Sequence, residues 1–144
     1  MGEIIVAFTI ACVLAVLSML HVYWGVEGIE ASSAFIPEVD GKPVFIPAAR
    51  DCYAVAAALA LACILVTTRG GLLRSPFPDT WTQIGTISVG AVLAMRAIGD
   101  FHMMGFFKRV RGTAFAEWDT RLFSPLSLLL GLATLWVALV GKTL

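Results

Sequence analysis

The chain has 144 residues, of which 59% are hydrophobic and only 14% are charged. Soluble domains carry about 25% charged residues, and a soluble domain of this length has too small an interior to bury so much apolar surface. Ten basic and ten acidic residues give a formal net charge of +0, which provides no reason to expect nucleic acid as a partner. The composition therefore predicts a single integral membrane domain over residues 1–144.

Four apolar stretches are long enough to cross a bilayer as helices. A hydrocarbon core about 30 Å thick requires roughly 20 helical residues, and helices pair every backbone polar group inside lipid. The first stretch has no basic n-region and no cleavage pattern, so we expect a retained span rather than a signal peptide. The predicted fold is all-α, a four-transmembrane-helix bundle. Its spans are residues 4–26, 52–68, 80–99 and 125–141.

The first connection, residues 27–50, is predicted to be a structured loop. It contains three prolines, and proline lacks a backbone donor, so we do not expect one continuous helix here. Asp40 and Gly41 form a turn signal, and residues 44–46 form either a short strand or an extended piece.

The third connection is the most charged, and its second half, residues 113–122, predicts a short interfacial helix before the fourth span. Three apolar residues would share one face of that helix, because they are three and four positions apart. Ser124 is then the predicted N-cap of the fourth span, with Pro125 at the first helical position. The residues that share the face are Phe115, Trp118 and Leu122.

The first half of this third connection mixes aromatic and basic residues. Such a segment belongs at the headgroup boundary, with its rings inserted and its cations on lipid phosphates. A specific site for an anionic lipid is a hypothesis that this pattern raises. The predicted headgroup-contacting residues are Phe106, Phe107, Lys108, Arg109 and Arg111.

Small residues at four-residue spacing predict places where helices pack closely. Ala54, Ala58 and Ala62 have this spacing on the second span, and Gly90 and Ala94 have it on the third. In lipid, where water does not drive helices together, small side chains let backbones approach each other.

Four crossings would bring polar residues from all four spans to one membrane face. This end holds either a network that only locks loops to helices, or a ligand-binding or catalytic pocket built on that network. The opposite end shows nothing similar in the sequence. The predicted polar cluster consists of His21, Trp24, Arg50, Asp51, Arg96, Asp100, His102, Asp119, Arg121 and Ser124.

Arg96 is the strongest signal in this cluster, because it lies about one turn inside the third span. A charge costs about 2.5–3.5 kcal/mol at the membrane centre on insertion scales, and less near an interface. Arg96 and Asp100 are therefore both expected to have tertiary partners. The expected pairs are Arg96 with Asp119 or Asp51, and Asp100 with Arg121 or Arg50.

His21 is the one histidine within a predicted span. It either makes a single interhelical hydrogen bond or takes part in proton transfer, since imidazole titrates near neutrality. Metal ligation would need partners such as His102, Asp100 or Cys52, and their spacing matches no metal motif. The three cysteines form no CxxC pair, and Cys12 and Cys63 are expected to be small buried apolar residues. No metal and no cofactor is predicted.

Three blocks of sequence resemble an uncharacterised family of small bacterial membrane proteins, known as a domain of unknown function. The blocks are HVYWG at residues 21–25, GKPVFIP at residues 41–47, and a long block from Arg96 to Leu126 that includes RAIGDF, GFFKRVR and DTRLFSPL. The resemblance implies the same four-span architecture. It implies no activity, cofactor or catalytic residue.

Three functions remain open at this point. The first is a binding or accessory membrane protein that holds a lipid, a small amphiphile or a partner subunit at the polar end. The second is a small membrane enzyme for a lipid-soluble substrate, with His21, Asp100 and Asp119 as acid–base candidates and Arg96 or Arg121 stabilising negative charge. The third is a dimeric transporter, which would need ionisable groups at mid-depth, where the sequence has none.

The distribution of basic residues predicts the orientation. The first and third connections carry six of them, and the other side carries three, so the positive-inside rule favours both connections in the cytoplasm of a bacterial inner membrane. The six are Lys42, Arg50, Lys108, Arg109, Arg111 and Arg121.

Overall fold

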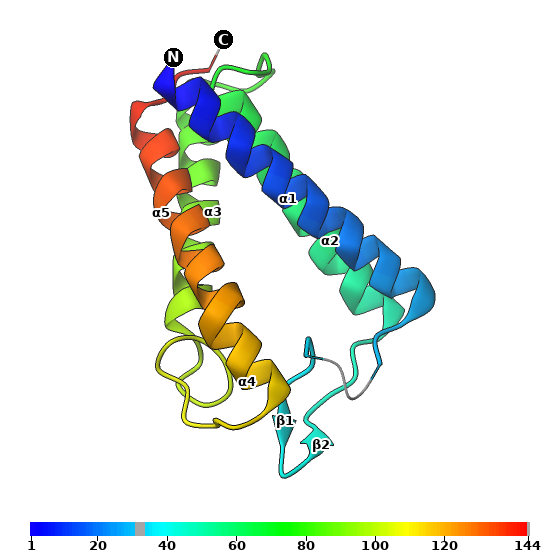
Figure 1. The fold of residues 1–144 in the computed structure, drawn as a ribbon. Helices are drawn as coiled ribbons and strands as arrows, with labels where there is room; N and C mark the ends of the chain where they lie inside the picture. Colours follow the sequence, from blue (N-terminus) through cyan, green and yellow to red (C-terminus); the bar gives the residue numbers. More distant parts are fainter. Residues whose placement is uncertain (31–33, 144) are drawn as a thin grey trace.

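The computed structural model describes residues 1–30 and 34–143, so residues 31–33 of the predicted first loop lie outside the described residues. The prediction of an all-α fold with four long helices is confirmed, and only two strands of two residues each accompany the helices in the described ranges (Figure 1). The elements in chain order are α1 (Gly2–Glu27), β1 (Glu38–Val39), β2 (Lys42–Pro43), α2 (Ala49–Arg69), α3 (Asp79–Ile98), α4 (Ala114–Trp118), η1 (Asp119–Phe123) and α5 (Ser124–Val140).

Three helices are long and apolar enough to cross a membrane. They are α1, α2 and a continuous helix, Ala114–Val140, that joins α4, η1 and α5. The remaining long helix, α3, has 20 residues and is not among these three.

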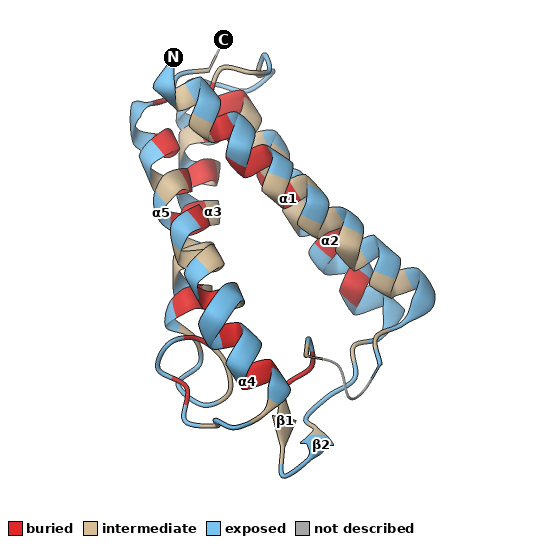
Figure 2. Ribbon diagram, in the orientation of Figure 1, coloured by how far each residue is buried: buried red, intermediate tan, exposed pale blue. Residues whose placement is uncertain are grey.

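The four long helices form two packed pairs, α1 with α2 and α3 with α5 (Figure 1). The pairs meet near the end that carries both chain termini and diverge toward the end that carries β1 and β2. Buried Ala7, Leu14, Val66 and Val137 belong to the core that joins the pairs. Most buried positions face the space between helices, while the outward faces are exposed (Figure 2).

Close packing between α3 and α5 occurs where small residues predicted it. A Cβ added at Gly131 would lie 2.8 Å from the backbone nitrogen of Ala94 and 3.0 Å from the carbonyl oxygen of Gly90. The two backbones therefore approach each other directly at this crossing. The prediction for Gly90 and Ala94 is confirmed.

The prediction for the alanines of α2 is wrong for two of the three. Ala62 is buried, but Ala54 and Ala58 are exposed and line an open apolar cleft of about 640 Å³ beside α3. The opposite side of α2 packs on α1 instead, where Ser18 donates a hydrogen bond to the Ala56 carbonyl at 2.8 Å. Spacing alone identifies a smooth helix face and does not determine which neighbour covers it.

The turn at Asp40 and Gly41 is confirmed, with φ angles of 52° and 73°. Two successive positive φ values match the hairpin turn that joins short antiparallel strands. The strand falls on Lys42–Pro43, one position before the predicted segment. The backbone N–H of Val44 extends the pairing by one bond, to the carbonyl of Pro37 at 2.9 Å.

The predicted interfacial helix is not separate, because it continues directly into the fourth span. The N-cap is Thr113, whose hydroxyl accepts the N–H of Ala116 at 3.1 Å, so the prediction that Ser124 caps the span is wrong. The wider π-turn of η1 precedes Pro125, which lacks a backbone N–H and crowds the carbonyl four residues earlier. A single wide turn absorbs both effects and keeps the helix continuous.

Candidate functional site

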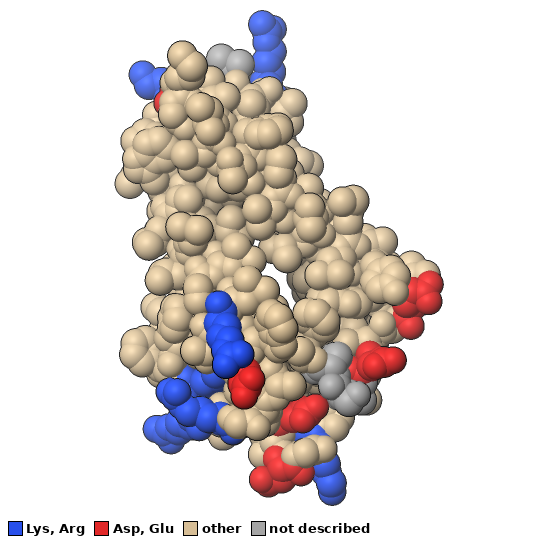
Figure 3. Space-filling view, in the orientation of Figure 1, with Lys and Arg blue, Asp and Glu red and all other residues tan. Residues whose placement is uncertain are grey.

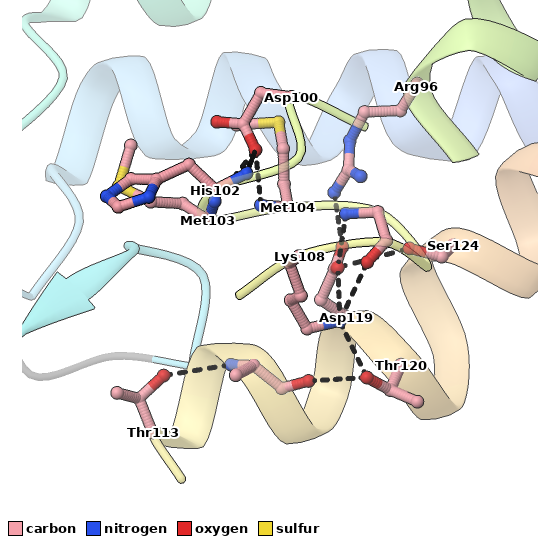
Figure 4. Close-up of polar contacts among 12 residues, drawn as sticks. Arg96, Asp100, His102, Met103, Met104, Lys108, Thr113, Asp119, Thr120 and Ser124 are labelled. Atoms are coloured by element: carbon pink, nitrogen blue, oxygen red, sulfur yellow. Dashed lines mark hydrogen bonds and ion pairs between the residues drawn. The ribbon is translucent and has the colours of Figure 1, made fainter. Parts of the chain in front are cut away.

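A buried carboxylate, Asp119, organises the end of the molecule where the third connection meets α3 and η1 (Figure 4). Its Oδ1 accepts from Arg96 Nη2 at 2.7 Å. Its Oδ2 accepts from Lys108 Nζ at 3.0 Å, the Gly105 N–H at 2.8 Å and the Ser124 hydroxyl at 3.1 Å. Two cations and two neutral donors thus meet one carboxylate, and the predicted pairing of Arg96 with Asp119 is present.

Lys108 lies inside this cluster and not at the headgroup boundary. The residue is 3% exposed, and its ammonium group also donates to the Gly105 carbonyl at 3.0 Å and the Thr120 hydroxyl at 2.6 Å. The prediction of headgroup contact is therefore wrong for Lys108, because its charge is used within the fold. The other residues of that prediction are exposed: Phe106, Phe107, Arg109 and Arg111.

The third connection folds back onto the end of α3 through two glycines. Gly99 and Gly105 have φ angles of 89° and 88°, and a side chain at either would overlap the backbone of the other strand of the loop. The N–H of Phe106 returns to the Ala97 carbonyl at 2.9 Å. This fold-back directs the Gly105 N–H toward Asp119.

Asp100 stabilises the same loop and has no arginine partner in the described part of the chain. Its Oδ1 accepts the backbone N–H groups of His102, Met103 and Met104 at 2.8–2.9 Å. Burial raises the pKa of the Asp100 carboxyl, but the N–H donors outweigh burial and hold that pKa below its ordinary value. The expected pairing with Arg121 or Arg50 is wrong, because the loop supplies the donors locally.

The remaining charged residues of the predicted cluster lie apart from Asp119. Arg50 Nε is 3.6 Å from Asp51 Oδ1 in an exposed pair of adjacent residues. Arg121 Nη1 is 3.9 Å from Glu117 Oε2, also in an exposed pair. His102 is exposed as well. The predicted cluster is thus divided: Arg96 and Ser124 both donate to the Asp119 carboxylate, whereas five charged or titratable residues are exposed at the surface, namely Arg50, Asp51, Asp100, His102 and Arg121.

A cavity of about 240 Å³ opens beside the Asp119 cluster, between α1 and the α3–α5 pair. Figure 3 shows an opening in the molecular surface between the two helix pairs. His21 and Trp24 of α1 line the cavity opposite Arg96 of α3, and the His21 and Trp24 rings are 4.9 Å apart between centroids. The other lining residues are Leu17, Leu20, Phe35, Phe115, Phe123, Leu126 and Ser127.

Arg96, which lines this cavity, has one nitrogen without a hydrogen-bond partner in the described part of the chain. Its Nη2 binds Asp119, but its Nη1 is buried and has no hydrogen-bond partner among the described residues. A buried donor left unpaired costs about 1–3 kcal/mol, and more when it carries charge. Together with Lys108, Arg96 also leaves one positive charge in excess of the Asp119 carboxylate.

His21 makes its hydrogen bond within α1, so the prediction of an interhelical bond is wrong. Its Nδ1 is 2.8 Å from the Leu17 carbonyl oxygen. A carbonyl only accepts, so Nδ1 carries the hydrogen, and in the neutral ring Nε2 is an acceptor. In the described residues, no group of three or more His, Cys, Asp or Glu side chains lies close enough to hold a metal ion.

The opposite end of the molecule has a second ion pair, between a buried arginine and an exposed aspartate, which the sequence interpretation missed. Arg69 is 3% exposed and binds the Asp79 carboxylate and the Ala138 carbonyl, the latter at 3.0 Å. Asp79 also accepts from the backbone N–H and hydroxyl of Thr143. The available signal was one Arg at the end of a span and one Asp at the start of the next.

Comparison with known proteins identifies one match. The sequence model of a family described as "Protein of unknown function (DUF3995)" matches residues 14–134. This range contains every residue that lines the cavity and the whole Asp119 cluster. No curated protein and no solved structure matches the chain. The resemblance to an uncharacterised family, which three blocks of the sequence had indicated, is confirmed.

Proposed function

The chain belongs to this family of unknown function, and we propose that it is an integral membrane protein that binds a small amphiphile in the cavity between α1 and α5. The observation that carries the proposal is that Arg96 lines the cavity and that its buried Nη1 has no hydrogen-bond partner among the described residues. An oxygen of the ligand would accept from this nitrogen. The hydrocarbon part would lie against the aromatic and leucine side chains around it.

The charge of the site favours an anionic head on the ligand. Arg96 and Lys108 share the single carboxylate of Asp119, so a carboxylate or phosphate oxygen at Nη1 would neutralise the excess. A neutral carbonyl oxygen would accept a hydrogen bond from Arg96 Nη1, but it would leave the excess positive charge of the cluster without a counter-ion. The His21 ring, on the opposite wall, would contact the same head group.

Binding is favoured over catalysis because neither candidate carboxylate presents a free oxygen to the cavity. Asp119 accepts four hydrogen bonds, and Asp100 accepts three and is not part of the cavity wall. Asp119 is fully buried and presents no oxygen to a substrate, and Asp100, although exposed, lies away from the cavity. His21 would be the one acid–base candidate left at the cavity.

We propose in addition that α3 crosses the membrane, although it is not among the three helices that are long and apolar enough by composition. Its polar side chains have internal partners: Thr86 is buried and donates to the Thr82 carbonyl at 2.7 Å, and Gln83 donates to the Ala138 carbonyl at 3.2 Å. Its outward face is apolar and would suit lipid. The exposed residues of that face include Trp81, Ile84, Val92 and Met95.

A pair of probes with the same chain and different heads tests the proposed ligand chemistry. Purified protein in neutral detergent is titrated with a twelve-carbon carboxylate and with the matching alcohol, and binding is measured by native mass spectrometry. We expect the carboxylate to bind more tightly, and Arg96→Gln to weaken it roughly tenfold to hundredfold, as for a lost charge-assisted hydrogen bond.

Two controls separate binding from stability. Lys108→Met disturbs the same Asp119 cluster from outside the cavity wall and removes the excess charge, so it should weaken carboxylate binding less than Arg96→Gln does and leave alcohol binding unchanged. Ser127→Leu fills the cavity and should weaken both probes, whereas Leu129→Phe on the exposed side of α5 should affect neither. Equal binding of carboxylate and alcohol, unaffected by Arg96→Gln and Ser127→Leu, would rule the proposal out.

A further inference from the structure

A second, smaller cavity of about 210 Å³ lies on the other side of the Asp119 cluster, where the third connection meets α4 and η1. Arg111 and Arg121 line it, together with the Lys108 side chain and Glu117. None of these residues except Lys108 belongs to the cluster around Asp119. This cavity shares no lining residue with the one proposed to hold the amphiphile.

The charges around this smaller cavity are predominantly positive. Arg111 and Arg121 face a single carboxylate, Glu117, and the 3.9 Å pair between Glu117 and Arg121 is exposed and weak. Beneath the cavity, Arg96 and Lys108 outnumber Asp119. Four cations against two carboxylates leave two positive charges in excess. Figure 3 shows Lys and Arg side chains gathered near the third connection.

Exposed apolar side chains surround the same corner of the molecule. Phe107 is 63% exposed and Trp118 is 51% exposed, and Leu122 lies one turn beyond Trp118. Aromatic residues next to basic ones are typical of the boundary between hydrocarbon and headgroups. At that depth the group that two arginines bind best is a phosphate, because the guanidinium geometry matches its oxygens.

We propose that the cavity between Arg111 and Arg121 is a phosphate-binding site, which in the membrane is occupied by the headgroup of an anionic phospholipid. The two guanidinium groups bind the phosphate oxygens. The rings of Phe107 and Trp118 lie beside the upper part of the acyl chains. Glu117 limits the affinity, because its carboxylate lies on the same cavity wall.

The test measures lipid binding to the full chain in neutral detergent by native mass spectrometry. The probes are short-chain phosphatidylglycerol, short-chain phosphatidylcholine and inorganic phosphate. We expect phosphatidylglycerol to bind best. The double variant Arg111→Gln/Arg121→Gln should lower the affinity for phosphatidylglycerol roughly tenfold or more. Each basic residue near the membrane surface contributes about a factor of five to the affinity for an anionic lipid. Glu117→Gln should raise the affinity, a change that a purely structural role would not produce.

A matched loss of two charges at the opposite end serves as the control. Arg74 and Lys142 are exposed there, and Arg74→Gln/Lys142→Gln should leave phosphatidylglycerol binding unchanged. Displacement of the lipid by millimolar inorganic phosphate would support the phosphate site and indicate that a soluble phosphate also fills it. Equal binding of the two lipids in every variant would overturn the proposal, and would leave the amphiphile cavity untouched.

Discussion

Asp119 is the residue on which the polar end depends, because one carboxylate there pairs with two cations. Arg96 comes from α3, Lys108 from the third connection and Asp119 from η1, so the cluster joins three successive parts of the chain. The carboxylate is completely buried. A buried pair of this kind contributes little when intact, but it is costly to break because the remaining charge has no partner.

Asp119→Asn is therefore expected to destabilise the protein by about 3–5 kcal/mol, since a neutral amide leaves Lys108 charged and buried. The free energy of unfolding can be measured by titration with a denaturing detergent. Glu117→Gln, which removes an exposed carboxylate two residues away, should cost at most about 1 kcal/mol. Adding Lys108→Met to Asp119→Asn should restore part of the loss. Equal stability of the two single variants would contradict this account.

The residues of the polar end could be predicted only in part. A charge inside an apolar span must have a partner, and this was enough to propose Asp119 for Arg96. The burial of Lys108 could not be predicted, because a basic segment with two phenylalanines has the same composition at a membrane surface. The deciding feature is the fold-back at Gly99 and Gly105, which depends on positive φ angles and not on charge.

At the scale of the elements, the length of each apolar run in the sequence predicts a long helix. The sequence does not predict which helices pack against each other. Gln83 and Arg96 lower the hydropathy of α3, yet its length was predicted from the surrounding apolar residues. The join between α4 and α5 was missed because Ser124 and Pro125 resemble the start of a helix. In the structure the π-turn of η1 lets the helix pass this point.

The crossing of α3 and α5 gives a prediction about an element. Gly131→Ala should destabilise the protein by about 1–3 kcal/mol, because the new Cβ meets the backbone of Ala94 and Gly90, which cannot rotate away. Gly85→Ala on α3 is the matched control. Its Cβ would meet only the two methyl groups of Leu65, at 3.0 and 3.2 Å, and these can move.

The control should be neutral or stabilising, since alanine is favoured over glycine within a helix by about 1 kcal/mol. Unfolding in denaturing detergent compares the two variants directly. A larger loss for Gly85→Ala than for Gly131→Ala would mean that α3 and α5 do not approach each other at this point.

At the scale of the whole molecule, the position of α3 decides how the cavity meets the membrane. If α3 crosses, the first and third connections lie on one side, and the two cavities open at the same membrane surface. If α3 does not cross, the third connection lies on the side of the second connection, residues 70–78. The apolar outward face of α3 favours the first arrangement.

Cysteine labelling distinguishes these arrangements. Single cysteines are introduced at the exposed residues Lys42, Arg74 and Arg109, in a background without the three native cysteines. Intact cells are treated with a membrane-impermeant thiol reagent, before and after permeabilisation. We expect Arg74→Cys to react in intact cells, and Lys42→Cys and Arg109→Cys to react only after permeabilisation, as the positive-inside rule predicts.

The two parts of this result are independent of each other. If Lys42→Cys and Arg109→Cys react under the same condition, both lie on one side of the membrane. This result requires α3 to cross, whichever side that is. Labelling of Arg109→Cys together with Arg74→Cys would place α3 outside the bilayer. The Arg96 side chain would then reach its cavity from the membrane surface and not from within a span, and a soluble anion would become a better candidate ligand than an amphiphile.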